Sequence, residues 1–464
     1  MQKIRLYDAT KLDREHMMFS NKQLITLLLP IMVEQLLNSF MGMADTMMVS
    51  NVGSAAISAV SLVDSINVLV IQVFTALGAG AAIICSQYLG RGDRESSNEA
   101  ARQVTLSVLT ISTVLSILCI VFRGPLLHLI FGQVEEAVMD NSMIYFLLTA
   151  ISFPFIALFD AGGAFYRAAG NSRFPMMISV LSNGLNIAGN AVLIFGFQMG
   201  VEGAALSTLF SRIFCAVVIF WNLRKPDQVI VVNHYLKIRP NFPLIGKILS
   251  IGIPSGIENG MFQFGKLAIQ SSVSTLGTAA IAAQAMTIIL ENLNGIGAIG
   301  IGIGLMTVVG QCIGAGKVEE ARYYMVKLCG YAEIVILISC AVVFLLTKPV
   351  TFLAGMEAES ASLCMEMIIA ITIVKPIVWV LAFIPAYGMR AAGDVKFSMI
   401  LSSLTMWFCR VALCVYLIRS CGFGPMAVWI GMFADWTLRA IAFSVRYLSG
   451  RWSRIHVILP VFIT

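Results

Sequence analysis

The chain has 464 residues, of which 58% are hydrophobic and 12% are charged, with a formal net charge of +6 and a mean hydropathy of +0.86. Soluble domains carry about 25% charged residues, so no soluble fold could cover this much apolar surface. The composition therefore predicts a polytopic membrane protein. The residues before position 23 are polar and charged, so we expect no cleavable signal peptide, and the first apolar segment would act as the insertion signal.

Breaks at glycine, proline and charged clusters divide the apolar sequence into twelve segments of bilayer-spanning length. Six are predicted in the first half, at 23–48, 55–83, 100–122, 141–165, 174–196 and 203–223. Six more are predicted at 244–272, 279–308, 324–347, 362–388, 397–418 and 426–448. We expect an all-α fold with two six-helix lobes, 23–223 and 244–448, a linker at 224–243, and terminal segments at 1–22 and 449–464.

The second half of the sequence repeats the first. At a shift of 224 residues, positions that match include Pro30 and Pro254, Glu34 and Glu258, Gly53 and Gly277, Gly78 and Gly302, and Gly90 and Gly314. Each copy holds an even number of spans, so both copies enter the membrane from the same side. The pattern predicts parallel repeats related by an axis along the membrane normal, as is typical of two-lobed transporters.

Lysine and arginine are distributed unevenly between alternate loops. One side of the predicted membrane carries 23 of them, whereas the opposite loops hold only Arg123, Lys348 and Arg419. By the positive-inside rule, both termini are expected in the cytoplasm. This topology accounts for the positive net charge, so we expect no nucleic-acid partner.

Several segments resemble the MATE (multidrug and toxic compound extrusion) family over essentially the whole chain. They are Asp45-Thr46-Met47-Met48-Val49, Tyr166-Arg167-Ala168-Ala169-Gly170, and the loop Gln87-Tyr88-Leu89-Gly90-Arg91-Gly92 with its copy Gln311-Cys312-Ile313-Gly314-Ala315-Gly316. The resemblance implies a cation-coupled antiporter of the plasma membrane that exports organic, usually cationic, compounds by alternating access. Its partners would be a small-molecule substrate and membrane lipid, and it would act as a monomer without a cofactor, using sodium ions or protons as the coupling ion.

Ionisable and amide side chains inside the first lobe are candidates for the coupling site, because an ionisable group at membrane depth costs a few kcal/mol or more. Glu34 and Asp45, with Asn38 and Met41 between them, lie on one stripe of the first span, since eleven residues make about three helical turns. In the fifth span one face carries Asn183, Asn186 and Asn190. Amide oxygens suit a sodium ion, but the same face could serve only to hydrogen-bond neighbouring helices.

The resemblance implies a cation site made by Asp45, Asn186, Asn190 and Thr208, and these four would hold sodium if the protein is sodium-coupled. Some relatives carry aspartate where this chain has Asn190, so the choice between sodium and protons stays open. Glu34 is a further coupling candidate.

The remaining candidates come from both lobes, and most of those for the substrate cavity lie in the second. We expect a substrate cavity lined by Glu258, Lys266, Lys375, Met41, Phe262 and Glu291. A contact of Glu258 with Lys375 or Lys266 is a hypothesis, and a buried structural pair is the alternative. Asp435 and Arg439 are four residues apart, which predicts an internal ion pair. Weaker candidates are Asp64, Asp160, Arg212 and Arg410.

The segment Gly295–Gly300 spells G-x-G-x-x-G, but it lies inside a membrane helix, where small residues favour close helix packing rather than nucleotide binding. No Walker lysine motif or catalytic set is recognisable, so we expect neither a nucleotide partner nor an enzyme. One alternative is a lipid-linked oligosaccharide flippase of the same superfamily, for which the cations Lys266, Lys375, Arg212 and Arg410 could bind pyrophosphate. A channel would need a pore loop, which the sequence does not show.

Overall fold

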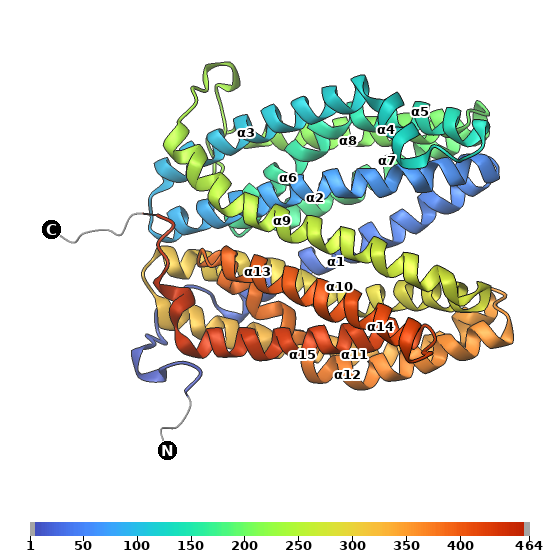
Figure 1. Cartoon of the computed structure of the whole chain (residues 1–464). Coiled ribbons are helices and arrows are strands. Elements are labelled where there is room, and N and C mark those ends of the chain that lie inside the picture. Colours follow the sequence, from blue (N-terminus) through green and yellow to red (C-terminus); the bar gives the residue numbers. More distant parts are fainter. Residues whose placement is uncertain (1–4, 459–464) are drawn as a thin grey trace. The chain divides into compact units, whose positions relative to one another are not determined.

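The computed structural model describes residues 5–458, and these residues form helices joined by short loops (Figure 1). The first repeat comprises α1 (Asn21–Ser50), α2 (Ser54–Gly90), α3 (Arg94–Val121), α4 (Arg123–Phe131), α5 (Glu136–Ile151), α6 (Phe153–Ala168), α7 (Arg173–Asn190), the π-helical segment η2 (Ala191–Gly196) and α8 (Val201–Leu223). The second comprises α9 (Phe242–Val273), α10 (Thr278–Gly314), α11 (Val318–Leu353), α12 (Ala358–Ala391), α13 (Val395–Thr405), the π-helical segment η5 (Met406–Ala412), α14 (Leu413–Ser420) and α15 (Met426–Ser449). Short 3-10 turns occur at Ala9–Lys11, Tyr235–Lys237, Ser274–Leu276 and Arg451–Arg454.

The helices confirm a multi-pass membrane protein. Ten of them are long and apolar enough to cross a membrane, and the pair α5 and α6, bent by 42°, makes an eleventh. The twelfth predicted span is α9, which has 32 residues and the same place in its repeat as α1, but which carries the polar residues Glu258 and Lys266. Large apolar side chains remain on the outside of the bundles, as a lipid environment requires, among them Leu129, Leu345, Phe352, Leu353 and Phe408.

The two repeats fold alike. The longest helix of each, α2 and α10, has 37 residues and begins directly after a glycine with positive φ, at Gly53 (139°) and Gly277 (98°). Residues with a side chain rarely adopt this backbone conformation, which explains why glycine occurs at both equivalent positions. In each repeat this long helix packs against the next helix and against the fourth span. The predicted α-helical duplication is therefore seen in packing as well as in sequence.

The chain divides into two compact units that are not contiguous in sequence. Unit 1 comprises Met1–Gln35 with Ile257–Thr464, and unit 2 comprises Leu36–Gly256. These differ from the expected lobes 23–223 and 244–448 because α1 and α9 are each shared between the units. Both helices contain a proline shortly before the division, at Pro30 and Pro254, and proline removes one backbone hydrogen bond from a helix.

Glycines of α10, which have no side chain, allow α1 to approach this helix closely within unit 1. A Cβ atom at Gly300 would lie 2.9 Å from the Cα atom of Met32, and one at Gly304 would lie 2.2 Å from a methyl group of Leu28. A Cβ atom at Gly295 would lie 3.1 Å from the ammonium nitrogen of Lys375. The G-x-G-x-x-G segment thus serves helix packing, as the sequence predicted.

The linker is docked onto unit 2. The Arg94 guanidinium donates to the carbonyl of Val229 at 2.9 Å, and the Gln103 amide donates to the carbonyl of Arg239 at 2.8 Å. Val232 is fully buried. The linker therefore adds a hydrophobic anchor and backbone hydrogen bonds beside the start of α3.

The N-terminal segment lies against unit 1. The Tyr447 hydroxyl donates to the carbonyl of Leu6 at 2.6 Å, and the backbone N–H of Asp8 donates to Glu319 at 2.9 Å. These contacts place the start of the described chain beside the end of α15.

We expect Gly300→Ala to lower the free energy of unfolding by about 1–3 kcal/mol, because the new methyl group meets the backbone of α1 and forces the helices apart. The thermal unfolding midpoint of the purified protein in detergent measures the change. Gly330→Ala is the matched control, because nothing lies within 4 Å of a Cβ atom there and alanine favours a helix. Equal midpoints for the two variants would contradict the close approach.

Candidate functional site

Asp45 on α1 and Asn190 at the end of α7 are in direct contact in unit 2. The Asn190 side-chain amide donates a hydrogen bond to the Asp45 carboxylate. Asn190 is fully buried, and among residues 5–458 its side-chain oxygen has no hydrogen-bond partner. A carboxylate beside an unsatisfied amide oxygen offers the oxygen ligands that hard cations prefer.

The asparagine stripe of α7 connects it to two neighbouring helices. The Asn38 side-chain oxygen on α1 accepts hydrogen bonds from Asn183 at 3.0 Å and from Ser179 at 3.2 Å. The Ser207 hydroxyl on α8 donates to the side-chain oxygen of Asn186 at 2.9 Å. Part of the stripe thus holds helices together, while Asn190 alone of its three amides is hydrogen-bonded to an acid.

The structure brings some of the expected coupling residues together and separates others. Asn186 is hydrogen-bonded to Ser207, which precedes the half-buried Thr208, whereas Asn190 is hydrogen-bonded to Asp45. Met41 is half-buried on α1 in unit 2. Glu34 is buried, but it lies in the part of α1 that belongs to unit 1.

A second polar group in unit 2 involves a residue that the sequence did not single out. The buried Tyr145 hydroxyl donates to the Asp64 carboxylate at 3.1 Å. The Arg212 guanidinium donates to the Ser152 hydroxyl at 2.6 Å and interacts electrostatically with three acids, Asp45, Asp64 and Asp160. Nothing in the periodicity of α5 marks Tyr145, because its contact partner is 81 residues away.

Both π-helical segments lie next to candidate residues. In unit 2, η2 begins directly after Asn190, and in unit 1, η5 contains Arg410. The wider turns of a π-helix are frequent at functional sites. No feature of the sequence had marked either segment.

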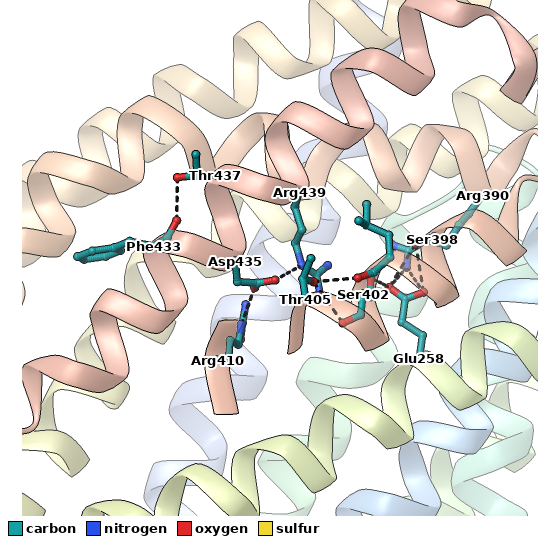
Figure 2. A network of polar contacts seen from close by, with 11 residues as sticks. Glu258, Arg390, Ser398, Ser402, Thr405, Arg410, Phe433, Asp435, Thr437 and Arg439 are labelled. Carbon is teal, nitrogen blue, oxygen red and sulfur yellow. Dashed lines mark hydrogen bonds and ion pairs between the residues drawn. The ribbon is translucent and has the colours of Figure 1, made fainter. Parts of the chain in front are cut away.

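In unit 1, Asp435 on α15 lies between two arginines (Figure 2). Its carboxylate accepts from Arg439 at 2.9 Å, which confirms the predicted pair, and from Arg410 of η5 at 2.5 Å. All three are buried. Removing one partner from such a group leaves an uncompensated charge, so it holds α15 against η5.

The hypothesis that Glu258 pairs with Lys375 or Lys266 is wrong. Glu258 contacts Arg390 at 3.4 Å and accepts a hydrogen bond from Ser402 at 2.8 Å (Figure 2). Lys375, which is fully buried, binds the Glu291 carboxylate at 2.8 Å. Since α12 continues to Ala391, Arg390 lies in its last turn rather than in a loop, and its long side chain reaches Glu258.

Lys266 and Phe262, one helical turn apart on α9, form another contact. The Lys266 ammonium lies 4.7 Å from the centre of the Phe262 ring, and the Arg410 guanidinium lies 4.9 Å from the same centre. Lys266 is exposed, whereas Phe262 is half-buried. Two cations therefore share one aromatic ring.

The chain is similar to several known proteins along most of its length. It is 27% identical over 461 residues to "Probable multidrug resistance protein NorM" from Thermotoga maritima, with 96% of each chain covered. It is 26% identical over 260 residues to "Multidrug export protein MepA" from Staphylococcus aureus, covering 56% of this chain and 57% of the relative. A solved structure described as the outward-facing conformation of a multidrug resistance MATE family transporter of the MOP superfamily matches with a TM-score of 0.86 and 20% identity, covering 93% of this chain and 96% of the other.

The profile of one family, MatE, matches the chain twice. The matches span residues 30–192 and 254–416, which fall in the first and second repeat. Together they include most of the chain and the larger part of both shared helices, α1 and α9. The chain belongs to the MatE family.

Proposed function

We propose that the chain is a secondary active antiporter that exports organic, drug-like compounds, cationic ones among them, across the plasma membrane in exchange for sodium ions or protons. Both termini lie in the cytoplasm in this proposal. The observation that carries it is the contact of Asp45 with Asn190, whose side-chain oxygen is buried without a partner in the described part of the chain. The names of the Thermotoga and Staphylococcus relatives support export of drugs as the direction of transport.

Cation binding at Asp45 changes the net charge inside unit 2 by one elementary charge. In an apolar interior this charge is costly unless a cation or hydrogen-bond donors compensate it. A conformation in which Asp45 meets water therefore favours loss of the cation, and a closed conformation favours its retention. Differential binding of this kind is the thermodynamic requirement for coupling ion flow to alternating access.

The flippase remains a second candidate because the interior of unit 1 is rich in cations. Lys375, Arg410 and Arg439 are buried there, and Lys266 lies nearby. A lipid-linked pyrophosphate would be attracted by such a group of charges. We place it second because the acid Glu291 already pairs with Lys375, and Asp435 with both arginines.

Asp45→Asn should reduce ethidium efflux to the level of cells without the protein, because an amide can neither release a proton nor neutralise a sodium ion. Efflux from an efflux-deficient bacterium, driven by imposed sodium or proton gradients, measures the loss and identifies the coupling ion. Asp140→Asn is the control, since Asp140 is exposed on α5. Inserted wild-type protein that moves no ethidium under either gradient would contradict the proposal and favour the flippase.

With sodium as the coupling ion, Asn190→Leu should raise the concentration for half-maximal transport by about tenfold, because leucine has no oxygen to replace the unsatisfied side-chain oxygen of Asn190 as a ligand. With protons as the coupling ion, the half-maximal concentration should fall instead, because the lost hydrogen bond is one that Asn190 donates to the charged carboxylate of Asp45. Initial rates in proteoliposomes, measured against ion concentration, report the shift.

Asn183→Leu is the matched control for this prediction. It removes an amide from the same helix face, but that amide contacts Asn38 rather than Asp45. Equal shifts in both variants would assign the stripe to helix packing alone.

A further inference from the structure

Two cations, Lys266 and Arg410, lie over the ring of Phe262 in unit 1. Arg410 is paired with Asp435, which also binds Arg439. Of the other charges in unit 1, Lys375 is paired with Glu291 and Glu258 with Arg390. Because a charge in an apolar interior attracts a counter-ion strongly, the cation over Phe262 that lacks a close acid needs an explanation.

Lys266 is the member of this group that has no acid partner. Among residues 5–458, no carboxylate lies within 4.0 Å of its ammonium group, although Arg410 and Glu291 are close enough to interact electrostatically. Lys375, by contrast, is fully buried and bonded to Glu291 at 2.8 Å. The exposed Lys266 is therefore accessible to a ligand, while the charges around it are already fixed in place.

The direction of the Lys266 side chain argues against a role at the membrane interface. A lysine that reaches for the headgroups extends toward the nearer end of its helix. Lys266 is closer to the end of α9 at Val273 than to its start at Phe242, yet its ammonium lies 4.7 Å from the Phe262 ring, one turn toward the start. Its ammonium thus lies over the Phe262 ring, which the buried Arg410 also contacts, and not toward the nearer helix end.

An independent feature of the same region is an unsatisfied donor. The indole N–H of Trp436 is buried and has no acceptor among the described residues. The Lys375 ammonium lies 5.9 Å from the centre of the Trp436 ring and 5.1 Å from that of Trp379. This part of unit 1 therefore holds a buried donor without an acceptor and two aromatic faces close to a cation.

We propose that Lys266 and Phe262 form a subsite for an oxyanion, a carboxylate or a phosphate, carried by an aromatic or apolar molecule. The ammonium would bind the oxyanion, the Phe262 ring would pack against the apolar part, and the field of Arg410 would add long-range attraction. The cargo class then includes zwitterionic compounds as well as simple cations. Binding at the subsite does not depend on the proposed export function. Only the identification of the bound molecule as a transported compound rests on it.

Two dyes that differ in a single group test the subsite. Rhodamine 19 carries a free carboxylate, and rhodamine 6G is its ethyl ester. With the purified full chain in a phosphate-free maltoside detergent, fluorescence polarisation should show about tenfold tighter binding of rhodamine 19, as expected for one charge-assisted hydrogen bond. Equal affinities of the wild-type protein for the two dyes would overturn the proposal.

Variants of Lys266 make the test specific. Lys266→Met should weaken rhodamine 19 binding about tenfold and leave rhodamine 6G binding within about twofold, whereas Lys266→Arg should retain the preference. Lys247→Met removes a cation from the same helix, about 28 Å along its axis, and should change neither affinity. If Lys266→Met weakens both dyes equally, Lys266 has a packing role and the subsite does not exist.

Competition distinguishes the sources of the anion. Displacement of rhodamine 19 by sodium benzoate indicates a carboxylate site for small molecules, and displacement by a short-chain phosphatidic acid indicates a lipid phosphate. Ethidium efflux reports the proposed function separately. Efflux without a dye preference rejects the subsite and keeps the exporter, whereas a dye preference without efflux keeps the subsite and rejects the exporter.

Discussion

The cost of an ion in an apolar medium governs how the interior of this protein is arranged. A buried charge is tolerated only with a counter-charge and hydrogen bonds around it, and most interior charges obey this rule. Asp435 lies between two arginines, and Lys375 meets Glu291. Asp45 and Lys266 are different, because the first is hydrogen-bonded to a neutral amide and the second lies over an aromatic ring. Each of these two groups therefore has a charge that can respond to a ligand.

The duplication preserved the fold and not the charges. The glycines before α2 and α10 and the prolines of α1 and α9 recur in both repeats, because they set the backbone. The interior charges have diverged: unit 2 holds Arg212 among three acids, Asp45, Asp64 and Asp160, whereas unit 1 places Lys266 and Arg410 over one aromatic ring. Two units with one fold and different interior charges can bind different ions, and this divergence supports the proposal of a cation in one and an oxyanion in the other.

The sequence sufficed for the architecture because hydropathy, glycine and proline mark where helices begin and end. It also predicted the pair of Asp435 and Arg439, whose spacing alone brings them together. The sequence did not predict the contact partner of Glu258, because that partner, Arg390, is 132 residues away. Such a contact depends on the rotation of each helix about its axis. In a membrane protein the lipid-facing and core-facing sides are equally apolar, so composition does not fix that rotation.

The two shared helices carry both unusual charges. Asp45 lies on α1 and Lys266 on α9, and each helix contributes residues to both units. Pro30 and Pro254 lie close to the points of division and weaken the helical hydrogen bonding there, so each helix can bend where the units separate. A cation bound at Asp45 therefore acts on a helix that continues covalently into unit 1, and an oxyanion at Lys266 acts on one that continues into unit 2. In the proposed exporter, this shared backbone is the shortest physical route by which ion binding and cargo binding can influence each other.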